Sequence, residues 1–157
     1  MLIFGCCIVH PSVMFKRTII ETSLCYSYPH AEDYALWVHI AQKYKITNIP
    51  EILFKYRRTG SQVSSKYAEE QLQTTLKIQL EQINALGIEP TEEERHLHWA
   101  VGCSQFTSSI SFANSVFLWL SKLKEANFLT HYYPEPAFTS LLRIFWNGGC
   151  QKLVEYF

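Results

Sequence analysis

The chain has 157 residues, of which 48% are hydrophobic and 15% aromatic, so it can fold around one sizeable core and is globular rather than disordered. Fourteen basic side chains balance fourteen acidic ones, which excludes the strongly basic surface typical of nucleic-acid-binding proteins. No stretch approaches the roughly 20 apolar residues that a membrane span needs. Five cysteines, an odd number without metal-ligand spacing, indicate reduced thiols, no metal site and a cytoplasmic location.

Three stretches in the first part of the chain are expected to be extended. Residues 1–9 are continuously apolar, which predicts a strand covered on both faces. A His-Pro pair ends it, and residues 12–15 predict a short second strand. A short helix is expected over residues 17–23. Residues 49–56 predict a third extended segment, which a proline interrupts.

A longer helix is predicted over residues 32–44, because Tyr34, Trp37 and the following apolar residues recur at helical spacing. Glu32 and Asp33, the only aspartate of the chain, then lie in its first turn. There the unpaired N–H groups and the helix dipole favour carboxylates. A carboxylate fixed at such a junction can serve as a general base. The alternative is an ordinary pair of N-terminal helix acids.

Four more helices are predicted in the second half of the chain. They span residues 67–86, 92–102, 112–126 and 136–146, with a polar linker over 103–111. Gly87 ends the first of them, and Thr91 with Glu94 forms a capping box for the second. The sequence Asn-Gly-Gly at 147–149 is expected to end the last helix.

Three blocks of sequence resemble the second half of a family 2 glycosyltransferase. They read HPSVMFKR (10–17), AEDYALW (31–37) and IPEILFKYR with GSQVS (49–57 and 60–64). The resemblance implies an α/β protein with a GT-A-like fold, truncated to few strands. Residues 1–64 would form the acceptor-side part of the catalytic domain, and residues 65–157 a predominantly helical C-terminal region.

The resemblance also implies an inverting transfer of sugar from a nucleotide-sugar donor to a sugar or lipid-linked acceptor, as in polysaccharide biosynthesis. Asp33 would then deprotonate the acceptor hydroxyl, with Glu32 as the next candidate. The side chains expected to contact substrate are His10, Tyr28, His30, Trp37, Arg57 and Arg58.

Most of these substrate-contacting residues have a structural alternative. The block that contains His10 lies beside the acceptor cavity in the family, yet a histidine here can simply hydrogen-bond a strand end. Tyr28 and His30 suit stacking on sugar rings and bonding their hydroxyls, and the alternative is that the tyrosines of this loop pack against Trp37. The two arginines can bind diphosphate bidentately or form a solvated basic turn.

Two features depart from the complete family pattern. Many members carry a histidine where this chain has Thr59, and threonine is a poorer metal ligand. With Asp33 as the only aspartate, the Asp-x-Asp motif that holds Mn²⁺ or Mg²⁺ against the donor is missing. We therefore expect a fragment that needs no cofactor of its own and is inactive alone. A non-catalytic helical interaction module is the alternative.

Association and location are the last expectations. An apolar strand over residues 1–9 without partners would leave an open edge, which favours a homo-oligomer. His96 and His98 stand two apart on a predicted helix and cannot face one metal ion. The protein is expected in the cytoplasm, including the inner face of the membrane.

Overall fold

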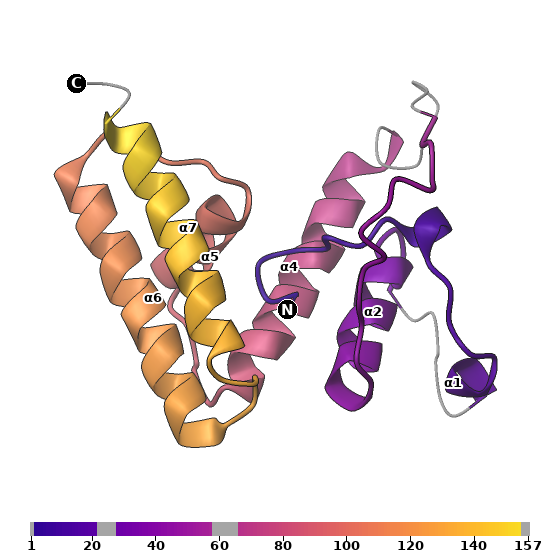
Figure 1. Cartoon of the computed structure of the whole chain (residues 1–157). Helices are drawn as coiled ribbons and strands as arrows, with labels where there is room; N and C mark the ends of the chain where they lie inside the picture. The colour runs from indigo at the N-terminus through magenta and orange to yellow at the C-terminus, as the bar shows by residue number, and fades with distance from the viewer. Residues whose placement is uncertain (1, 22–27, 58–65, 155–157) are drawn as a thin grey trace. The chain divides into compact units, whose positions relative to one another are not determined.

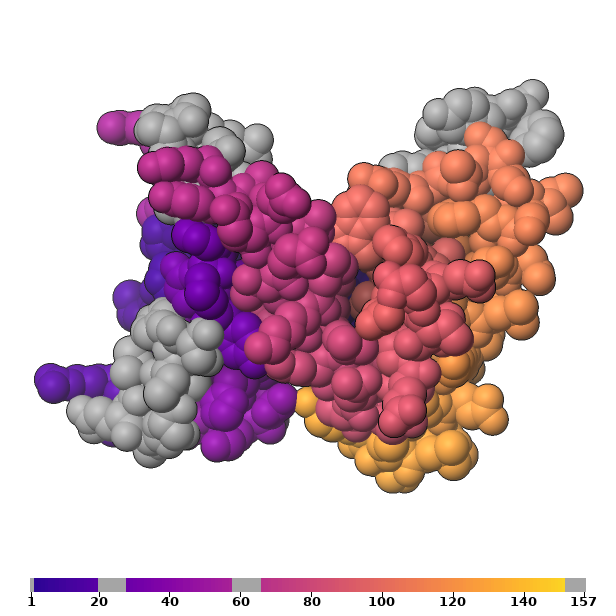
Figure 2. Space-filling view, turned by 180° about the vertical axis from the view of Figure 1, so that it is seen from behind, coloured from indigo at the N-terminus to yellow at the C-terminus, as the bar shows by residue number. Residues whose placement is uncertain are grey.

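The computed structural model describes residues 2–21, 28–57 and 66–154, and Figures 1 and 2 show it from opposite sides. Its regular elements are the 3-10 helix η1 (His10–Ser12) and the α-helices α1 (Thr18–Glu21), α2 (Glu32–Lys43), α4 (Ala68–Ala85), α5 (Glu92–Gly102), α6 (Ile110–Thr130) and α7 (Ala137–Val154). No β-strand occurs within the described ranges. The prediction of an α/β, GT-A-like domain with few strands is therefore wrong for the described chain.

The chain divides into two compact units. Leu2 and residues 4–78 belong to the N-terminal unit, and Ile3 and the residues from 79 onward belong to the C-terminal unit. This division falls inside α4. The domain boundary predicted between residues 64 and 65 lies outside the described residues and stays a prediction.

Only the start of the apolar N-terminal segment is buried, and it is not a strand; Cys6, Cys7 and Val9 are exposed. Leu2, Ile3 and Phe4 are all buried, but side chains rather than a neighbouring strand bond two of their carbonyl groups. The Tyr34 hydroxyl donates to Leu2 O (2.6 Å), and Nε2 of His98 lies 2.9 Å from Ile3 O. These bonds satisfy backbone groups that a sheet would otherwise have to pair. The apolar run thus indicated the burial of residues 2–4, but neither burial of the rest of the segment nor strand geometry.

The other two segments predicted as extended form no strand either. Ser12 belongs to η1, and its Oγ donates to Val9 O (2.7 Å). Residues 44–57 lack regular structure, and all of their side chains are exposed. Within the described ranges there is consequently no open strand edge to support the homo-oligomer expected through residues 1–9.

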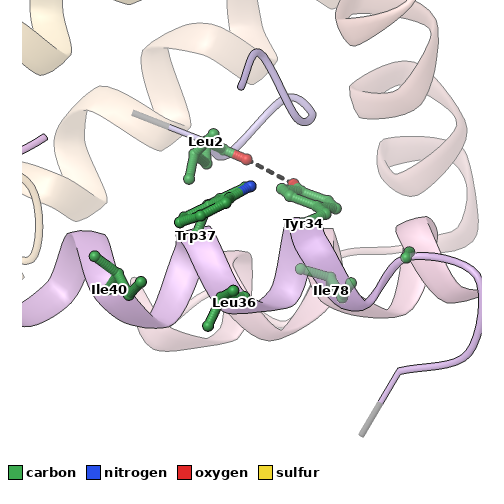
Figure 3. Packing of buried hydrophobic residues seen from close by; sticks show 7 residues of the cluster. Leu2, Tyr34, Leu36, Trp37, Ile40 and Ile78 are labelled. Carbon is green, nitrogen blue, oxygen red and sulfur yellow. Dashed lines mark hydrogen bonds between the residues drawn. The ribbon is translucent and has the colours of Figure 1, made fainter. Parts of the chain in front are cut away.

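Helix α2 supplies most of the core of the N-terminal unit, and its bounds confirm the predicted helix. The buried cluster consists of Leu2, Ala31, Tyr34, Leu36, Trp37, Ile40 and Ile78. Figure 3 shows Tyr34 and Trp37 projecting from α2 toward Leu2. Burying a side chain of this size stabilises the fold by about 1.5–3 kcal/mol. The start of α2 is therefore anchored by the core beneath it.

In the C-terminal unit α5, α6 and α7 contact one another, and Figure 1 shows α6 and α7 side by side. Buried Asn127 closes the connection between these two helices. Its Nδ2 donates to Tyr133 O (3.1 Å) and to Glu135 Oε1 (3.0 Å), and its Oδ1 accepts from Tyr133 N (2.7 Å). An amide is stable in this core because its polar atoms are paired.

Most helix ends follow their sequence signals. Gly87, with φ of +78°, follows α4 in the backbone conformation that glycine favours. The capping box of Thr91 and Glu94 opens α5, as predicted. Helix α6 begins earlier than expected because Ser109 caps it by accepting from Phe112 N, and it continues to Thr130.

Helix α7 does not end at the predicted Asn-Gly-Gly sequence but continues through it to Val154. Gly149 is buried, and a Cβ atom at this position would lie 2.4 Å from Cε1 of Phe106. A Cβ atom at Gly148 would meet nothing within 4 Å. The second glycine therefore gives room to an aromatic ring instead of stopping the helix.

His98 is the most consequential buried polar residue of this unit. Its Nδ1 accepts a hydrogen bond from Trp119 Nε1 (3.2 Å), so Nε2 carries the proton and donates to Ile3 O. Burial lowers the pKa of His98 from 6.5 to about 4, against the opposing effect of the Ile3 bond. The imidazole is accordingly neutral at pH 7.

Stability should fall as the pH drops from about 6.5 to about 4. In this window the imidazole of His98 is protonated in the unfolded chain but not in the folded one. The free energy of unfolding therefore loses about 1.4 kcal/mol per pH unit from this group, and the contribution is complete above pH 6.5. Urea denaturation at several pH values measures it. His98→Gln should lack this component and the exposed control His96→Gln should retain it, so equal profiles for wild type and His98→Gln would contradict the assignment.

Gly149→Ala should destabilise the chain by about 1–3 kcal/mol, because the new methyl group overpacks the site of Phe106. Gly148→Ala is the matched control and should be neutral or stabilising by up to about 1 kcal/mol, since alanine is the better helix former. Thermal denaturation of the two variants gives the comparison. A stabilising Gly149→Ala substitution would show that the close approach of the ring does not exist.

Candidate functional site

The start of α2 holds the two carboxylates that the sequence singled out. The N-cap residue Ala31 provides no side-chain cap. Asp33 Oδ1 instead accepts a hydrogen bond from Tyr34 N (2.7 Å), and Asp33 is half-buried while Glu32 is exposed. Of the two carboxylates, Asp33 is the one that the surrounding protein fixes in place.

The negative charge of Asp33 acts on the thiol of Cys6. The sequence did not indicate that these two residues are neighbours. Cys6 is exposed as a residue, yet desolvation of its thiol by neighbouring groups raises the thiol pKa to about 11. A backbone hydrogen bond with Ile8 acts in the opposite direction, and the negative charge of Asp33 raises the pKa further. The thiol is therefore neutral at physiological pH and is a poor nucleophile.

Trp37 lies one helical turn after Asp33, on the same side of α2. Its ring is 3% exposed and is covered by His10 and Phe15, whose ring centroids lie 5.6 and 5.9 Å from that of Trp37. The indole Nε1 is buried without a hydrogen-bond partner in the described part of the chain. The structure thus brings His10 and Trp37 together, with exposed His10 as the outer residue of the pair.

The loop before α2 is held by α4. His30 has a left-handed backbone conformation (φ +63°), and its ring stacks on Tyr67 at 4.3 Å. Gln71 Nε2 donates to the His30 carbonyl oxygen (2.6 Å), while Lys77 Nζ lies 5.2 Å from the Tyr28 ring centroid. These contacts hold Tyr28 and His30 against the side of α4 and the residue that precedes it.

The contribution of α4 was missed by the sequence reasoning. Tyr67 directly precedes α4. Gln71 lies seven residues before Ile78 on one face of that helix, and Ile78 is buried in the core. That periodicity is visible in the sequence. It indicates a shared face, but it does not reveal that His30 packs on it.

Of the two arginines of the predicted site, the structure describes only Arg57. Arg57 is exposed at the end of the irregular segment 44–57. Arg58 and Thr59 lie outside the described residues. The contact of Arg57 and Arg58 with a diphosphate stays a prediction.

The described side chains form no site for the divalent cation that the family resemblance implies. Within residues 2–21, 28–57 and 66–154 no three histidine, cysteine, aspartate or glutamate side chains gather to hold a metal ion. Asp33 is the only aspartate of the whole sequence, so a paired-aspartate motif is absent.

Within the described ranges, no helix is both long and apolar enough to cross a membrane.

Comparison with known proteins finds two similar glycosyltransferases. An uncharacterized glycosyltransferase of Haemophilus influenzae is 38% identical over 89 residues, which cover 52% of this chain and 28% of that protein. The bifunctional glycosyltransferase pgtA of Dictyostelium discoideum is 36% identical over 91 residues, covering 53% of this chain and 12% of that protein. No protein-family profile and no solved structure matches the chain. About half of the chain is therefore similar to proteins named glycosyltransferases, of whose lengths it spans less than a third.

Alkylation should report the closeness of Cys6 and Asp33. Iodoacetamide at pH 8 should modify Cys6 at least about tenfold more slowly than an unhindered peptide thiol, because little thiolate forms. Asp33→Asn should accelerate the reaction, since the loss of negative charge lowers the thiol pKa. Fragment-ion mass spectrometry separates Cys6 from Cys7, which is also exposed and serves as the internal comparison. If Asp33→Asn leaves the alkylation rate of Cys6 unchanged, the charge of Asp33 does not act on the thiol.

Proposed function

We propose that this chain supplies the acceptor-side part of a family 2 glycosyltransferase, with Asp33 as its general base. The observation that carries the proposal is the half-buried carboxylate of Asp33, fixed at the first turn of α2. Support comes from the similarity of about half of the chain to proteins named glycosyltransferases. A helix N-terminus favours a carboxylate in its first turn, and a carboxylate held beside an acceptor hydroxyl can serve as a general base.

In the proposed reaction Asp33 accepts the proton of the acceptor hydroxyl while the hydroxyl oxygen forms a bond to the anomeric carbon of the donor. The bond between that carbon and the nucleoside diphosphate breaks, and the electron pair leaves with the diphosphate. Attack opposite the leaving group inverts the anomeric configuration. Donor and cation binding are assigned to protein outside these 157 residues, so the chain alone transfers no sugar.

The other predicted site residues divide according to their exposure. Contact with the acceptor is assigned to His10, Tyr28 and His30. Trp37 is buried beneath His10, so its role is to position that imidazole rather than to stack on substrate. Arg57 and Arg58 are assigned to the charge of the departing diphosphate.

A helical interaction module is the second candidate, and one observation favours it. Ile49, Ile52 and Leu53 are 66%, 98% and 70% exposed. Large apolar side chains gathered in one exposed segment are typical of protein-binding surfaces. Such a module would bind a partner without needing Asp33.

Asp33→Asn in an enzyme that contains this chain should lower turnover by about 10² or more, the scale of lost general-base catalysis. Release of nucleoside diphosphate from a panel of nucleotide sugars measures turnover. The cost in stability should stay below about 1 kcal/mol, because only one carboxylate at a helix N-terminus is lost. Glu69→Gln, in the first turn of α4, is the matched control for removing such a charge and should retain full turnover.

Glu32→Gln decides between the two acids. If Glu32→Gln abolishes turnover and Asp33→Asn does not, the base is Glu32. Unchanged turnover in both variants would reject the base assignment and favour the interaction module.

A further inference from the structure

A groove runs between α5 and α6 in the C-terminal unit, and its lining contains none of the residues assigned above. Its volume is about 770 Å³, within the range of small-molecule sites. Its lining includes the polar residues Glu93, Glu94, His96, Ser115 and Lys122 and the aromatic residues Trp99, Phe112 and Trp119. Figure 2 shows the face of the molecule on which α5 (red) and α6 (orange) lie at the surface.

Aromatic rings form much of the groove wall. Trp99 and Phe112 are partly exposed, whereas Trp119, which also lines the groove, is 2% exposed. Trp119 is fixed because its Nε1 donates to His98. The wall is therefore rigid before a ligand arrives, which lowers the entropy cost of binding.

The two basic side chains of the groove lining, Lys122 and His96, each have a carboxylate partner. Lys122 Nζ lies 2.6 Å from Glu94 Oε1, and His96 Nε2 lies 3.2 Å from Glu92 Oε1. The Glu94 carboxylate also accepts a hydrogen bond from Thr91 N (2.9 Å). Partial desolvation acts to raise the pKa of Glu94, but the hydrogen bonds from Lys122 and Thr91 hold that pKa below its usual range. Among the described lining residues, no cation is left over for a phosphate, and a phosphate-bearing ligand is disfavoured.

The groups that remain suit a neutral ligand with hydroxyl groups. Glu93 is exposed and its carboxylate accepts hydrogen bonds. The Ser115 hydroxyl at the wall donates to Ser111 O (3.2 Å), and its oxygen can still accept. A pyranose ring has an apolar C–H face that packs on an aromatic ring, and hydroxyl groups around its edge that bond such acceptors. The lining of the groove matches this division.

We propose that this groove binds a neutral saccharide, as an acceptor-chain subsite separate from the catalytic carboxylate. The choice of a sugar over another neutral amphiphile rests on the proposed function. The site itself belongs to α5 and α6, so its occupation requires neither the donor nor Asp33. Such a subsite would hold sugar units of the acceptor that do not react.

The test uses the full 157-residue chain with three probes: lactose, maltose and N,N′-diacetylchitobiose. Saturation-transfer NMR and the indole N–H shifts of the tryptophans should reveal saturable binding of at least one probe at about 20 mM, since millimolar dissociation constants are ordinary for single contacts of this kind. Trp99→Leu should weaken that binding about tenfold. Glu93→Gln, an exposed and nearly isosteric change, should weaken it severalfold and covers the case in which Trp99→Leu does not fold.

Two controls separate this proposal from the proposed function. Glu125→Gln removes a charge from α6 outside the groove and should leave binding unchanged. Asp33→Asn should also bind normally, so its failure in transfer would not affect the subsite. The proposal is overturned if none of the three sugars binds, if both groove variants bind like wild type, or if uridine diphosphate displaces the sugar.

Discussion

The pairing of buried polar groups is the constraint on which the fold depends. His98 is almost fully buried, yet both of its ring nitrogens have partners, Ile3 O on one side and Trp119 Nε1 on the other. A buried imidazole can remain in an apolar core only if it is neutral and hydrogen-bonded. In the N-terminal unit the Tyr34 hydroxyl bonds the Leu2 carbonyl, although the buried Trp37 Nε1 has no hydrogen-bond partner among the described residues. Side chains thus replace the neighbouring strand that an apolar N-terminal segment was expected to need.

This replacement explains which parts of the fold could be predicted. Helices α2, α4 and α5 carry amphipathic periodicity and end signals within their own sequences, and they lie within a residue or two of the predicted bounds. Strands depend on partners elsewhere in the chain, and a short apolar run does not reveal whether such partners exist. Glycine was ambiguous for a similar reason: Gly87 ends a helix, whereas Gly149 admits the Phe106 ring inside one.

The candidate site was predictable to the same extent. Placing Asp33 in the first turn of α2 required only local periodicity, and the structure confirms that position. Its neighbour Cys6 and the α4 residues behind His30 are brought in by tertiary packing, which leaves no local signal. Trp37 illustrates the limit of pattern reading. A tryptophan on the apolar stripe of a helix can either line a pocket or fill the core, and here it fills the core.

The placement of Asp33 and of the α5–α6 groove has a consequence for how this chain can change in evolution. Asp33 is fixed by bonds within the N-terminal unit, and the groove by the capping box, the Glu94–Lys122 pair and the Trp119–His98 bond within the C-terminal unit. Substitutions in the groove wall, at exposed positions such as Glu93, therefore leave the bonds around Asp33 intact. If proton transfer and acceptor recognition are divided in this way, the acceptor preference can change by substitution on two helices while the base remains where the first turn of α2 holds it.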